Sequence, residues 1–388
     1  FQFTDAAYFR RCLEMAFEQE SLQMSTFYYA LQEYSKKYSM KAVLTNNWFD
    51  IGHEDKYYNS KLEVRAREFN HITIDKNRGI LKKTSDDKDK FIGEIKWYLK
   101  LPADVEYVRP RIFDYSTSYI NPYVSMEYYA YHTVHELFLY GDLTLQQWID
   151  IFNRIRFVCD DFKRYTVQDD NIRPALEEMY LTKTLQRFEK MKKDERFITF
   201  FESPIVVNGV RYLSLNEIII ALEKAIPEML YDVDTFNIIH GDLCFANIMV
   251  DSNFSFIKVI DPRGKFGTYD IYGDFRYELA KLFHSVDGKY DFIIKDLFDL
   301  DYNSETACIN YRIQDRKREF DLYKVFLSTF ATEIDRDLKK IELIEALLFL
   351  SMIPLHGESI RHQMVMLGTG LEILNRVIDI QIGEKKDV

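Results

Sequence analysis

The sequence predicts an α+β fold in which a small sheet carrying one helix is followed by a larger, mostly helical region. Two observations lead to this class. Residues 66–128 contain short runs with the alternation of half-buried strands, interrupted by one amphipathic helical stretch. Residues 129–388 are dominated by helical spacing of apolar residues, with one short hairpin pattern inserted. We therefore predict two lobes, preceded by an extension over residues 1–65.

The composition is that of a globular protein with enough apolar residues for a large core. The 388 residues carry 51 Lys and Arg against 62 Asp and Glu, a net charge of −11, and 47% are hydrophobic. This acidic balance argues against a protein that coats nucleic acid or an anionic membrane, because both need a basic face. It leaves room for a local basic pocket. Apolar runs are too short to span a membrane, and no signal peptide is recognisable, so we expect a cytoplasmic enzyme.

The first lobe is predicted from strand alternation and turn residues. Four segments carry strand patterns: residues 71–75, 80–84, 111–115 and 123–128. The first two are joined by a turn over residues 76–79, where Gly79 can supply a positive φ. A helix is expected over residues 87–99, with Ser85 or Asp86 as its cap.

The second lobe is predicted to be helical apart from residues 237–262, which read as strand, loop, strand, strand. Helical spacing is clearest over residues 143–165 and 172–192, and residues 277–300 and 318–381 are also expected to be helical. Residues 1–41 also show helical spacing, and residues 54–68 are charged and expected to be helical.

One stretch of the sequence gathers residues that point to a chemical function. Residues 238–250 read IIHGDLCFANIMV, and residues 256–264 read FIKVIDPRG. The apolar runs within them predict a hairpin, which brings Asp261 back beside Asn247, with Asp242 nearby. Three oxygen-bearing side chains then converge at one end of the hairpin. Such hard ligands suit Mg²⁺, which takes one or two protein ligands plus phosphates and water.

These groups are the ones that phosphoryl transfer requires. A carboxylate orients the attacking hydroxyl and accepts its proton, while an Asn and a second Asp hold the metal ions that offset phosphate charge. The spacing H-x-D-x-x-x-x-N from His240 to Asn247 matches the kinase catalytic loop, and Asp261 at the hairpin end matches the metal-binding Asp. We therefore predict a kinase with ATP and Mg²⁺ as cofactors.

The motif from His240 to Gly264 resembles the aminoglycoside phosphotransferase and choline kinase group of small-molecule kinases, a branch of the protein-kinase-like fold. Gly241, where protein kinases carry Arg, is typical of this branch, and Tyr272–Ala280 looks like the segment in which a Gly-Asp precedes a helix. The resemblance covers about residues 66–388. It implies a bilobal kinase-like fold and phosphate transfer to a hydroxyl- or amine-bearing small molecule.

The resemblance also implies roles for individual residues. In the catalytic set, Asp242 positions and deprotonates the acceptor, and His240 organises the loop as a buried residue rather than carrying a proton. Asn247 and Asp261 are the implied metal ligands.

A strand lysine paired with a helix glutamate holds the α- and β-phosphates in kinase folds. Here the glutamate is Glu94, and the lysine is Lys83 or its neighbour Lys82. We prefer Lys83, although the neighbouring residues leave the strand register open.

The hinge between the lobes is expected at residues 123–129. Met126 would lie near the back wall of the adenine pocket, and Glu127 and Tyr129 would offer backbone groups to the base. One feature departs from protein kinases: no G-x-G-x-x-G precedes Lys83. Because this branch often lacks that loop, the family assignment stands, but the segment that covers the phosphates is undefined.

Two other functions compete with a small-molecule kinase. A nucleotide-binding regulatory protein with a kinase fold and no turnover would be expected to lose one of Asp242, Asn247 and Asp261, and all three are present. A protein kinase is disfavoured because no activation segment is recognisable after Asp261. The role of Arg263 stays open between a phosphate contact and a cap on a local carbonyl.

One further polar group lies in the helical lobe and consists of His356, Glu358, Arg361 and His362. These residues could line a substrate pocket, although core and surface roles together are the more common outcome for such a group.

The N-terminal extension carries a resemblance of its own. Residues 48–55, WFDIGHED, resemble the W-x-D-x-G segment near the end of sugar nucleotidyltransferase domains, which occur fused ahead of kinases in capsule and lipopolysaccharide pathways. The nucleotide-binding loop of that family is not in this chain. Residues 1–65 are then either a remnant or tail of an upstream or partner nucleotidyltransferase domain, or a helical extension. By analogy, the acceptor is a sugar, polyol or choline-like precursor of surface polysaccharide.

Overall fold

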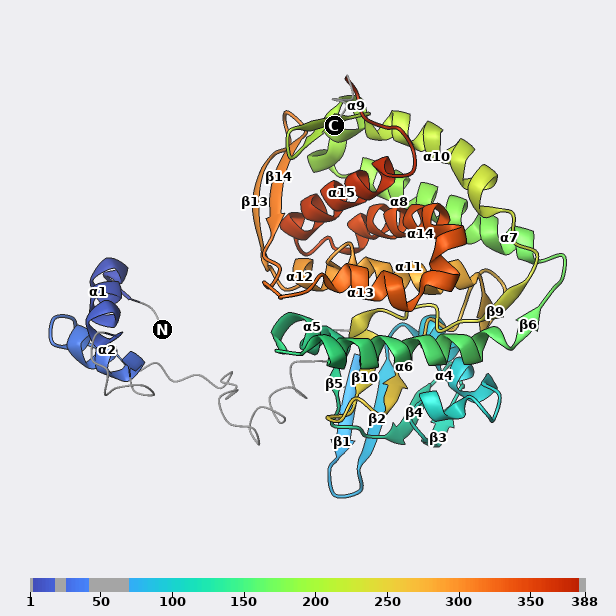
Figure 1. Cartoon of the computed structure of the whole chain (residues 1–388), viewed down its shortest axis with the longest axis horizontal. Helices are drawn as coiled ribbons and strands as arrows, with labels where there is room; N and C mark the ends of the chain where they lie inside the picture. The colour runs from blue at the N-terminus through green and yellow to red at the C-terminus, as the bar shows by residue number, and fades with distance from the viewer. Residues whose placement is uncertain (1–2, 18–25, 42–69, 384–388) are drawn as a thin grey trace. The chain divides into compact units, whose positions relative to one another are not determined.

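The computed structural model describes residues 3–17, 26–41 and 70–383 (Figure 1). The chain forms two compact units, Phe1–Arg65 and Ala66–Val388, and each is described by itself.

In the first unit, helices α1 (Ala6–Phe17) and α2 (Thr26–Ser35) pack through a small apolar cluster. The rings of Phe9 and Tyr34 meet edge to face at 5.7 Å within this cluster. The nucleotidyltransferase-like segment, residues 48–55, lies outside the described residues, as do residues 54–68, for which a helix was predicted.

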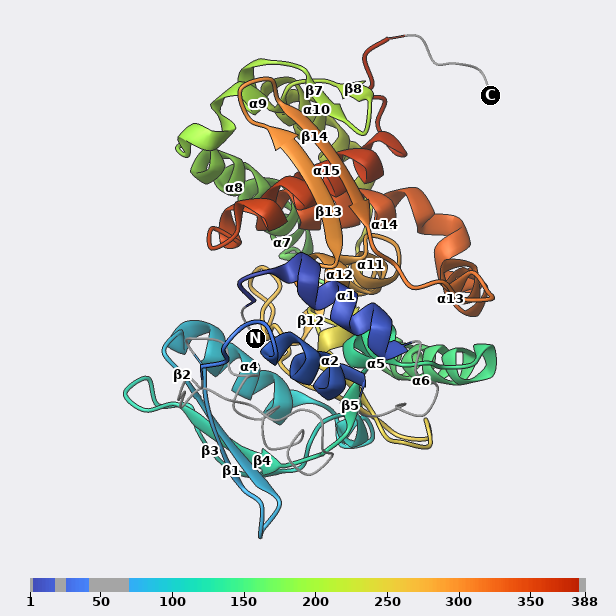
Figure 2. The same ribbon diagram turned by 90° about the vertical axis from the view of Figure 1, so that its left-hand side faces the viewer.

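The second unit has the predicted bilobal α+β fold. In Figures 1 and 2, a sheet of strands β1–β4 with helix α4 lies at one end, and helices α8, α10, α14 and α15 lie at the other. The sequence-based prediction of this fold class is therefore confirmed.

The small lobe is a four-stranded antiparallel sheet with the order β1-β2-β4-β3. Its strands are β1 (Asn70–Asp75), β2 (Ile80–Ser85), β3 (Ile112–Ser116) and β4 (Tyr123–Glu127). The β1–β2 turn follows the prediction, because Gly79 adopts φ +64°. The Asp75 carboxylate accepts the backbone N–H groups of Asn77 and Arg78 at 3.1 Å, which closes the turn.

Helix α4 (Lys88–Lys100) begins later than expected. Its cap is Asp87, whose carboxylate accepts the Lys90 N–H at 3.3 Å. The prediction of Ser85 or Asp86 as the cap was wrong, because β2 continues through Ser85. The buried side of α4 consists of Phe91, Glu94, Ile95, Trp97 and Tyr98. A glutamate is thus turned into the protein among apolar neighbours.

The large lobe contains most of the helices. The α-helices are α5 (Val134–Tyr140), α6 (Leu145–Lys163), α7 (Ile172–Leu176), α8 (Lys183–Lys192), α9 (Ile198–Glu202), α10 (Leu215–Leu230), α11 (Phe275–Val286), α12 (Tyr290–Ile293), α13 (Leu322–Thr329), α14 (Ala331–Met352) and α15 (Ile360–Asn375). A π-helical stretch, η2 (Glu177–Thr182), joins α7 to α8, and short 3₁₀ turns form η1 (Glu106–Val108), η3 (Glu195–Phe197), η4 (Phe245–Asn247) and η5 (Ile353–Leu355).

Three small sheets complete the large lobe. Two of them surround the predicted hairpin region: β5 (His132–Thr133), β10 (Ile248–Val250) and β11 (Ile257–Val259) form one, and β6 (Thr166–Val167), β9 (Phe236–Ile238) and β12 (Tyr272–Gly273) form the other. The strand, loop, strand, strand pattern predicted for residues 237–262 is therefore present as β9, β10 and β11.

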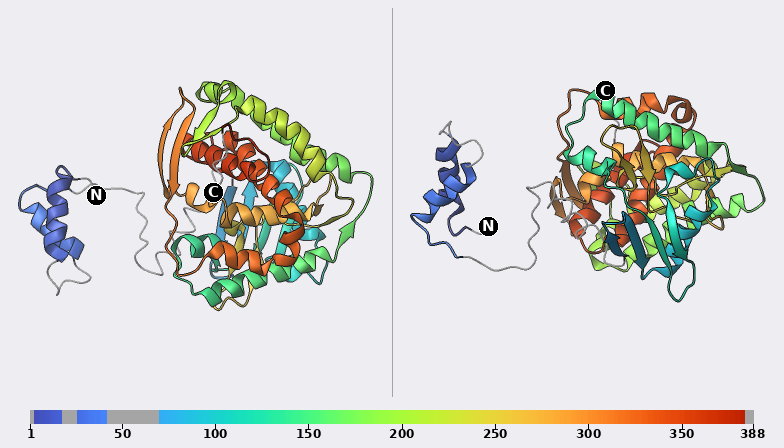
Figure 3. Two further views of the ribbon diagram at one scale, coloured as in Figure 1. Left: turned by 45° about the horizontal axis from the view of Figure 1, so that its top comes forward. Right: turned by 90° about the horizontal axis from the view of Figure 1, so that it is seen from below.

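The third small sheet differs from the prediction. It has the order β13-β14-β7-β8 and contains β7 (Ile205–Val207), β8 (Val210–Tyr212), β13 (Phe298–Asn303) and β14 (Cys308–Ile313). We expected helix up to residue 300. The strand forms because Phe298, Leu300 and Tyr302 alternate with exposed acidic and polar residues, a period of two that suits a sheet with one covered face. The β13–β14 ribbon runs beside α15 (Figure 3).

One large apolar core joins the small lobe to the helices of the large lobe and includes Trp97, Trp148, Phe245 and Phe283. In the part of the chain that the structure describes, no helix combines the length and apolar character needed to cross a bilayer.

Candidate functional site

The catalytic-loop motif is held from behind by a glutamate of α11. The loop begins where β9 ends, and the backbone N–H groups of His240 and Gly241 donate to the Glu278 carboxylate at 2.7 and 2.9 Å. Burial raises the pKa of Glu278 to about 7, while these two N–H donors act in the opposite direction. Gly241 adopts φ +74°, a conformation that a side chain at this position would strain.

His240 is buried in this loop. Its ring packs edge-on against Trp97 at 5.3 Å, and the Trp97 indole N–H donates to the Ile239 carbonyl at 2.7 Å. Burial lowers the pKa of His240 to about 4, so the imidazole is neutral near pH 7. A neutral, enclosed ring fits the predicted organising role better than proton transfer.

Asp242 and Asn247 lie side by side. The Asn247 side-chain nitrogen donates to the backbone carbonyl of Asp242 at 2.9 Å and to its Oδ2 at 3.1 Å. The other carboxylate oxygen of Asp242 is 2.9 Å from the ammonium of Lys281 in α11. Although burial by itself would lower it, the charge of Asp242 raises the pKa of Lys281 above its ordinary value. Asp242 is therefore fixed at both oxygens.

Lys83 forms the pair that was predicted with Glu94. Its Nζ lies 2.8 and 2.9 Å from the two carboxylate oxygens of Glu94 and 2.8 Å from Oδ1 of Asp261. Burial would lower the pKa of Lys83, but Asp261 and Glu94 raise it, so the lysine is a cation. Lys82 instead places its ammonium 4.2 Å from the ring centre of Tyr123. The structure thus places Lys83, and not Lys82, against Glu94.

The β10–β11 hairpin brings the second aspartate to the same place. The Ile260 N–H donates to the Asn247 carbonyl at 3.0 Å, so Asp261 follows directly beside Asn247. Asp261 has φ +56°, and its N–H donates to the Tyr98 hydroxyl at 3.0 Å, which helps to hold this unusual backbone.

A close contact between two glycines sets the distance between α4 and the segment after Asp261. A Cβ atom on Gly264 would lie only 2.2 Å from the backbone carbonyl of Gly93. Because Gly93 precedes Glu94, this contact positions the Lys83–Glu94 pair next to Asp261.

These residues line one cleft, whose walls are Lys83, Ser85, Asp87, Lys90, Phe91, Glu94, Asp242, Asn247, Asp261 and Pro262. Asn247 and Asp261 suit Mg²⁺ by their chemistry, because both supply hard oxygen donors. Both side-chain hydrogen bonds of Asn247 use its nitrogen, which leaves the amide oxygen as its ligand atom. The residues present therefore fit a magnesium ion.

The predicted hinge residues do not line this cleft. Met126 is buried in β4, and the Glu127 N–H donates to the Arg111 carbonyl at 2.8 Å. The Tyr129 hydroxyl donates to the Glu127 carboxylate at 2.7 Å. Since the Glu127 N–H is used within the sheet, the backbone group that Glu127 can offer a ligand is its carbonyl.

The Arg263 side chain donates to a hydroxyl group and not to a carbonyl in the described part of the chain, and its contact with phosphate stays a prediction. Its guanidinium donates to the Tyr277 hydroxyl at 2.7 Å, and its backbone N–H donates to the His240 carbonyl at 3.0 Å. This residue therefore ties the segment after Asp261 to the catalytic loop and to α11.

The sequence interpretation missed Lys281 and passed over Glu278. Both lie on α11 three residues apart, so they share a helix face. The available signal was a pair of opposite charges inside a helix that is otherwise largely apolar, directly after a recognised motif. Such a signal indicates a buried polar network but does not tell which residues Glu278 and Lys281 contact.

No protein-family model matches the chain, and no curated protein sequence matches it. Similar solved structures are aminoglycoside phosphotransferases, the group that the catalytic-loop motif resembles. The ternary complex of APH(2″)-IIa with streptomycin and ATP aligns at 14% identity over 86% of this chain and 97% of that chain, with a TM-score of 0.43. The apo form of a thermostable APH(4)-Ia mutant aligns at 12% identity over 81% of this chain and 93% of that chain, with a TM-score of 0.49. ADP-bound APH(2″)-Ib aligns at 13% identity over 83% of this chain and 98% of that chain, with a TM-score of 0.40.

Proposed function

We propose that this chain is an ATP- and Mg²⁺-dependent phosphotransferase that acts on a small molecule bearing a hydroxyl or amine group. The observation that carries the proposal is the convergence of Lys83, Asp242, Asn247 and Asp261 on one cleft. The groups that phosphoryl transfer needs are a cation for the phosphates, metal ligands and a carboxylate for the acceptor, and this set supplies all three.

In the proposed reaction, the bond between the γ-phosphorus of ATP and its bridging oxygen breaks, and a bond forms from that phosphorus to the acceptor oxygen or nitrogen. ADP leaves with the bridging oxygen, and the acceptor proton passes to Asp242. Because Lys281 lies against Oδ1 of Asp242, the orientation of the carboxylate is fixed. Asp242 then contributes mainly by orienting the acceptor, as a loose transition state requires.

Lys83 is the proposed phosphate anchor. Glu94 contacts the lysine through both of its oxygens, so Nζ is already ordered before phosphate binds and loses little side-chain freedom. Asn247 and Asp261 would hold Mg²⁺, which when bound offsets the charge of the β- and γ-phosphates. The adenine site that we propose is the hinge, with Met126 at its back wall and the backbone of Glu127 and Tyr129 facing the base.

The acceptors that we propose to test first are sugars, polyols and choline-like amino alcohols. This choice rests on the resemblance of residues 48–55 to a segment found ahead of kinases in surface-polysaccharide pathways. The carboxylate Asp242 is compatible with each of these classes, because each presents a hydroxyl group.

The test is Mg²⁺-dependent release of ADP from ATP, screened across sugars, polyols, amino alcohols, amino acids and aminoglycosides. We expect one class to stimulate ADP release, and we expect the stimulation to disappear when Mg²⁺ is chelated and in the Asp261→Asn variant. ATP binding with no stimulation by any class would contradict turnover and would favour a nucleotide-binding regulatory protein.

A further inference from the structure

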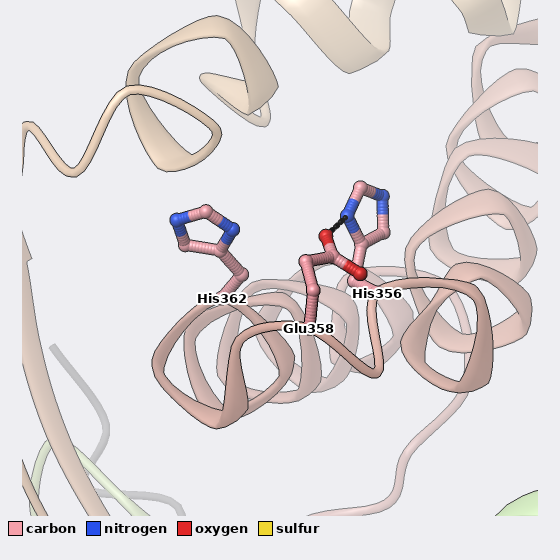
Figure 4. Close-up of side chains that lie close together, drawn as sticks. All are labelled: His356, Glu358 and His362. Carbon is pink, nitrogen blue, oxygen red and sulfur yellow. Dashed lines mark hydrogen bonds and ion pairs between the residues drawn. The ribbon is translucent and has the colours of Figure 1, made fainter. Parts of the chain in front are cut away.

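Two histidines and a glutamate meet in the large lobe at the turn between η5 and α15. His356 directly follows η5, and His362 lies in the first turn of α15. One donor atom from each of His356, Glu358 and His362 can be chosen so that all three lie within 4.8 Å of one another. Figure 4 shows the three side chains on the same side of the turn.

The backbone that carries these residues is well fixed. The His356 N–H donates to the Ile353 carbonyl at 3.2 Å, and the Ser359 N–H donates to the His356 carbonyl at 3.1 Å. The Ser359 hydroxyl caps α15 by accepting the His362 N–H at 3.2 Å. The three side chains are therefore presented by an ordered turn.

The hydrogen bonding of His362 indicates which nitrogen can serve as a ligand atom. Its Nε2 lies 3.0 Å from the Asp296 carboxylate, which as an anion can only accept, so the proton belongs on Nε2. Within the described chain, Nδ1 of His362 is buried and has no hydrogen-bond partner. In Figure 4 this nitrogen, next to the ring carbon that bears the side chain, faces Glu358 and His356. A buried acceptor atom of this kind needs a partner, and a cation supplies one.

His356 supplies its nitrogen only after a change of tautomer. Its Nε2 lies 3.4 Å from the Tyr290 hydroxyl, and its Nδ1 lies 3.0 Å from Oε1 of Glu358. Nδ1 faces a carboxylate and carries the proton, and binding of an ion moves that proton to Nε2, where the Tyr290 hydroxyl can accept its hydrogen bond. Nδ1 of His356, Nδ1 of His362 and the Glu358 carboxylate then form one donor set. A carboxylate on the far nitrogen of a metal-binding histidine is a common arrangement, because it fixes the tautomer and makes the ligand more basic. Asp296 occupies that position behind His362.

We propose that His356, Glu358 and His362 form a binding site for a divalent transition-metal ion of the Zn²⁺ class. Two imidazoles and one carboxylate are ligands that Zn²⁺ accepts, whereas the hard oxygen ligands of the kinase cleft suit Mg²⁺. Tetrahedral Zn²⁺ ligands lie roughly 3.4 Å apart, so a modest movement completes the set. Glu358 can make that movement, because 65% of its side chain is exposed.

A second part of the large lobe would support the proposed site through a hydrogen bond to one of its ligands. Asp296, which supports His362, lies between α12 and β13, while the three ligands belong to the η5–α15 turn. With three protein ligands and Glu358 at the surface, the fourth position faces solvent. This site is separate from the proposed phosphotransferase function, and either can fail without the other.

The test is Zn²⁺ binding to the full-length protein, measured by competition with a chromophoric chelator in excess Mg²⁺, with Co²⁺ absorption as a second signal. We expect one ion per chain, with at least about 10-fold weaker binding in Glu358→Gln and His362→Ala. Asp296→Asn, which keeps all three ligands, should also weaken binding by about 10-fold or more. Thermal denaturation in chelator checks that each variant is folded.

Two controls make the result specific. His71→Ala removes an exposed histidine outside the cluster. Asp261→Asn changes a proposed Mg²⁺ ligand in the cleft of the other site. Zn²⁺ binding should be unchanged in both variants. The proposal is overturned if the wild-type protein binds no stoichiometric Zn²⁺ at micromolar concentration. It is also overturned if folded His362→Ala and Glu358→Gln bind as the wild type does, because the ion then resides elsewhere.

Discussion

Two buried lysines meet carboxylates beside the cleft, and the two pairs are built in opposite ways. In the small lobe, Lys83 is held by both oxygens of Glu94, whose side chain is only 9% exposed. In the large lobe, Lys281 touches one oxygen of Asp242, whose side chain is 31% exposed. Lys83 lines the cleft, whereas Lys281 is not among its lining residues.

We propose that each pair contributes one partner that contacts the ligand and one that positions it. Exposure does not distinguish the partners of the first pair, because the Lys83 side chain is 5% exposed and both residues line the cleft. The assignment rests on charge: only the cation Lys83 attracts phosphate, and we propose that Glu94 positions it. In the second pair the carboxylate is the accessible group, and Lys281 positions Asp242 from behind. In the proposed phosphotransferase, the same chemical pair presents a cation to phosphate in one lobe and an anion to the acceptor in the other.

The substitution expected to distinguish the roles of the two lysine–carboxylate pairs most strongly is Lys83→Met. Losing the phosphate anchor should lower kcat/KM for ATP by about 100-fold, roughly 2.7 kcal/mol. Lys82→Met is the matched control and should stay within about 2-fold, because its ammonium lies over Tyr123. ATP titrations of ADP formation measure both variants. Equal losses in the two would contradict the role of Lys83.

Lys281→Met should act on a different parameter. Without its cation, Asp242 loses orientation, so we expect kcat to fall by about 30-fold while the KM for ATP stays within about 2-fold. Lys281→Arg keeps the charge and should recover part of the rate. A variant that raises the KM for ATP without lowering kcat would show that Lys281 serves the nucleotide instead.

Acid should weaken the loop that carries Asp242. Burial lowers the pKa of His240 to about 4 from an ordinary 6.5, so its contribution to stability is fully present above pH 6.5 and is lost as pH falls toward 4. The loss at pH 5 is about 2 kcal/mol. The measurement is the free energy of unfolding in urea between pH 7 and 5, for the wild type, for His240→Asn and for His71→Asn, which changes an exposed histidine.

The His240→Asn variant should show a shallower decline in unfolding free energy than the wild type, while His71→Asn should follow the wild type. Part of the pH dependence should persist in His240→Asn, because burial also lowers the pKa of His284. Identical slopes in all three proteins would rule out His240 as a source.

A smaller effect tests how the Lys83–Glu94 pair is placed beside Asp261. Gly264 and Gly79 both have φ +64°, so an alanine costs a similar backbone strain at either position. Only Gly264 faces another backbone, that of Gly93. Gly264→Ala should therefore destabilise the protein by about 1–2 kcal/mol more than Gly79→Ala. Urea unfolding compares them, and equal losses would contradict the close contact.

The sequence was most informative where function is encoded locally. Asp242, Asn247 and Asp261 lie within one short loop and hairpin, so their spacing predicted that they converge. Lys83 could not be separated from Lys82, because a one-residue change of register reverses the face of a strand. Pairing of Lys83 with Val124 in β4 sets that register, and it is a long-range contact.

Other features depend on partners that a linear pattern does not contain. Lys281 meets Asp242 from a helix that begins more than 30 residues later, and nothing in the local sequence names the contact. The β13–β14 strands form in part because β14 pairs with β7, about 100 residues earlier in the chain. Tertiary pairing of this kind overrides local periodicity.

The most direct test of the account uses the acceptor found by the screen and compares the wild type with Asp242→Asn. Phosphorylated acceptor is measured by mass spectrometry under single turnover, and Mg·ATP affinity is measured in parallel by calorimetry. We expect product formation to be slower by about 10²–10⁴-fold in the variant, with the Kd for Mg·ATP within about 3-fold of the wild type. Wild-type rates of product formation in Asp242→Asn would contradict it.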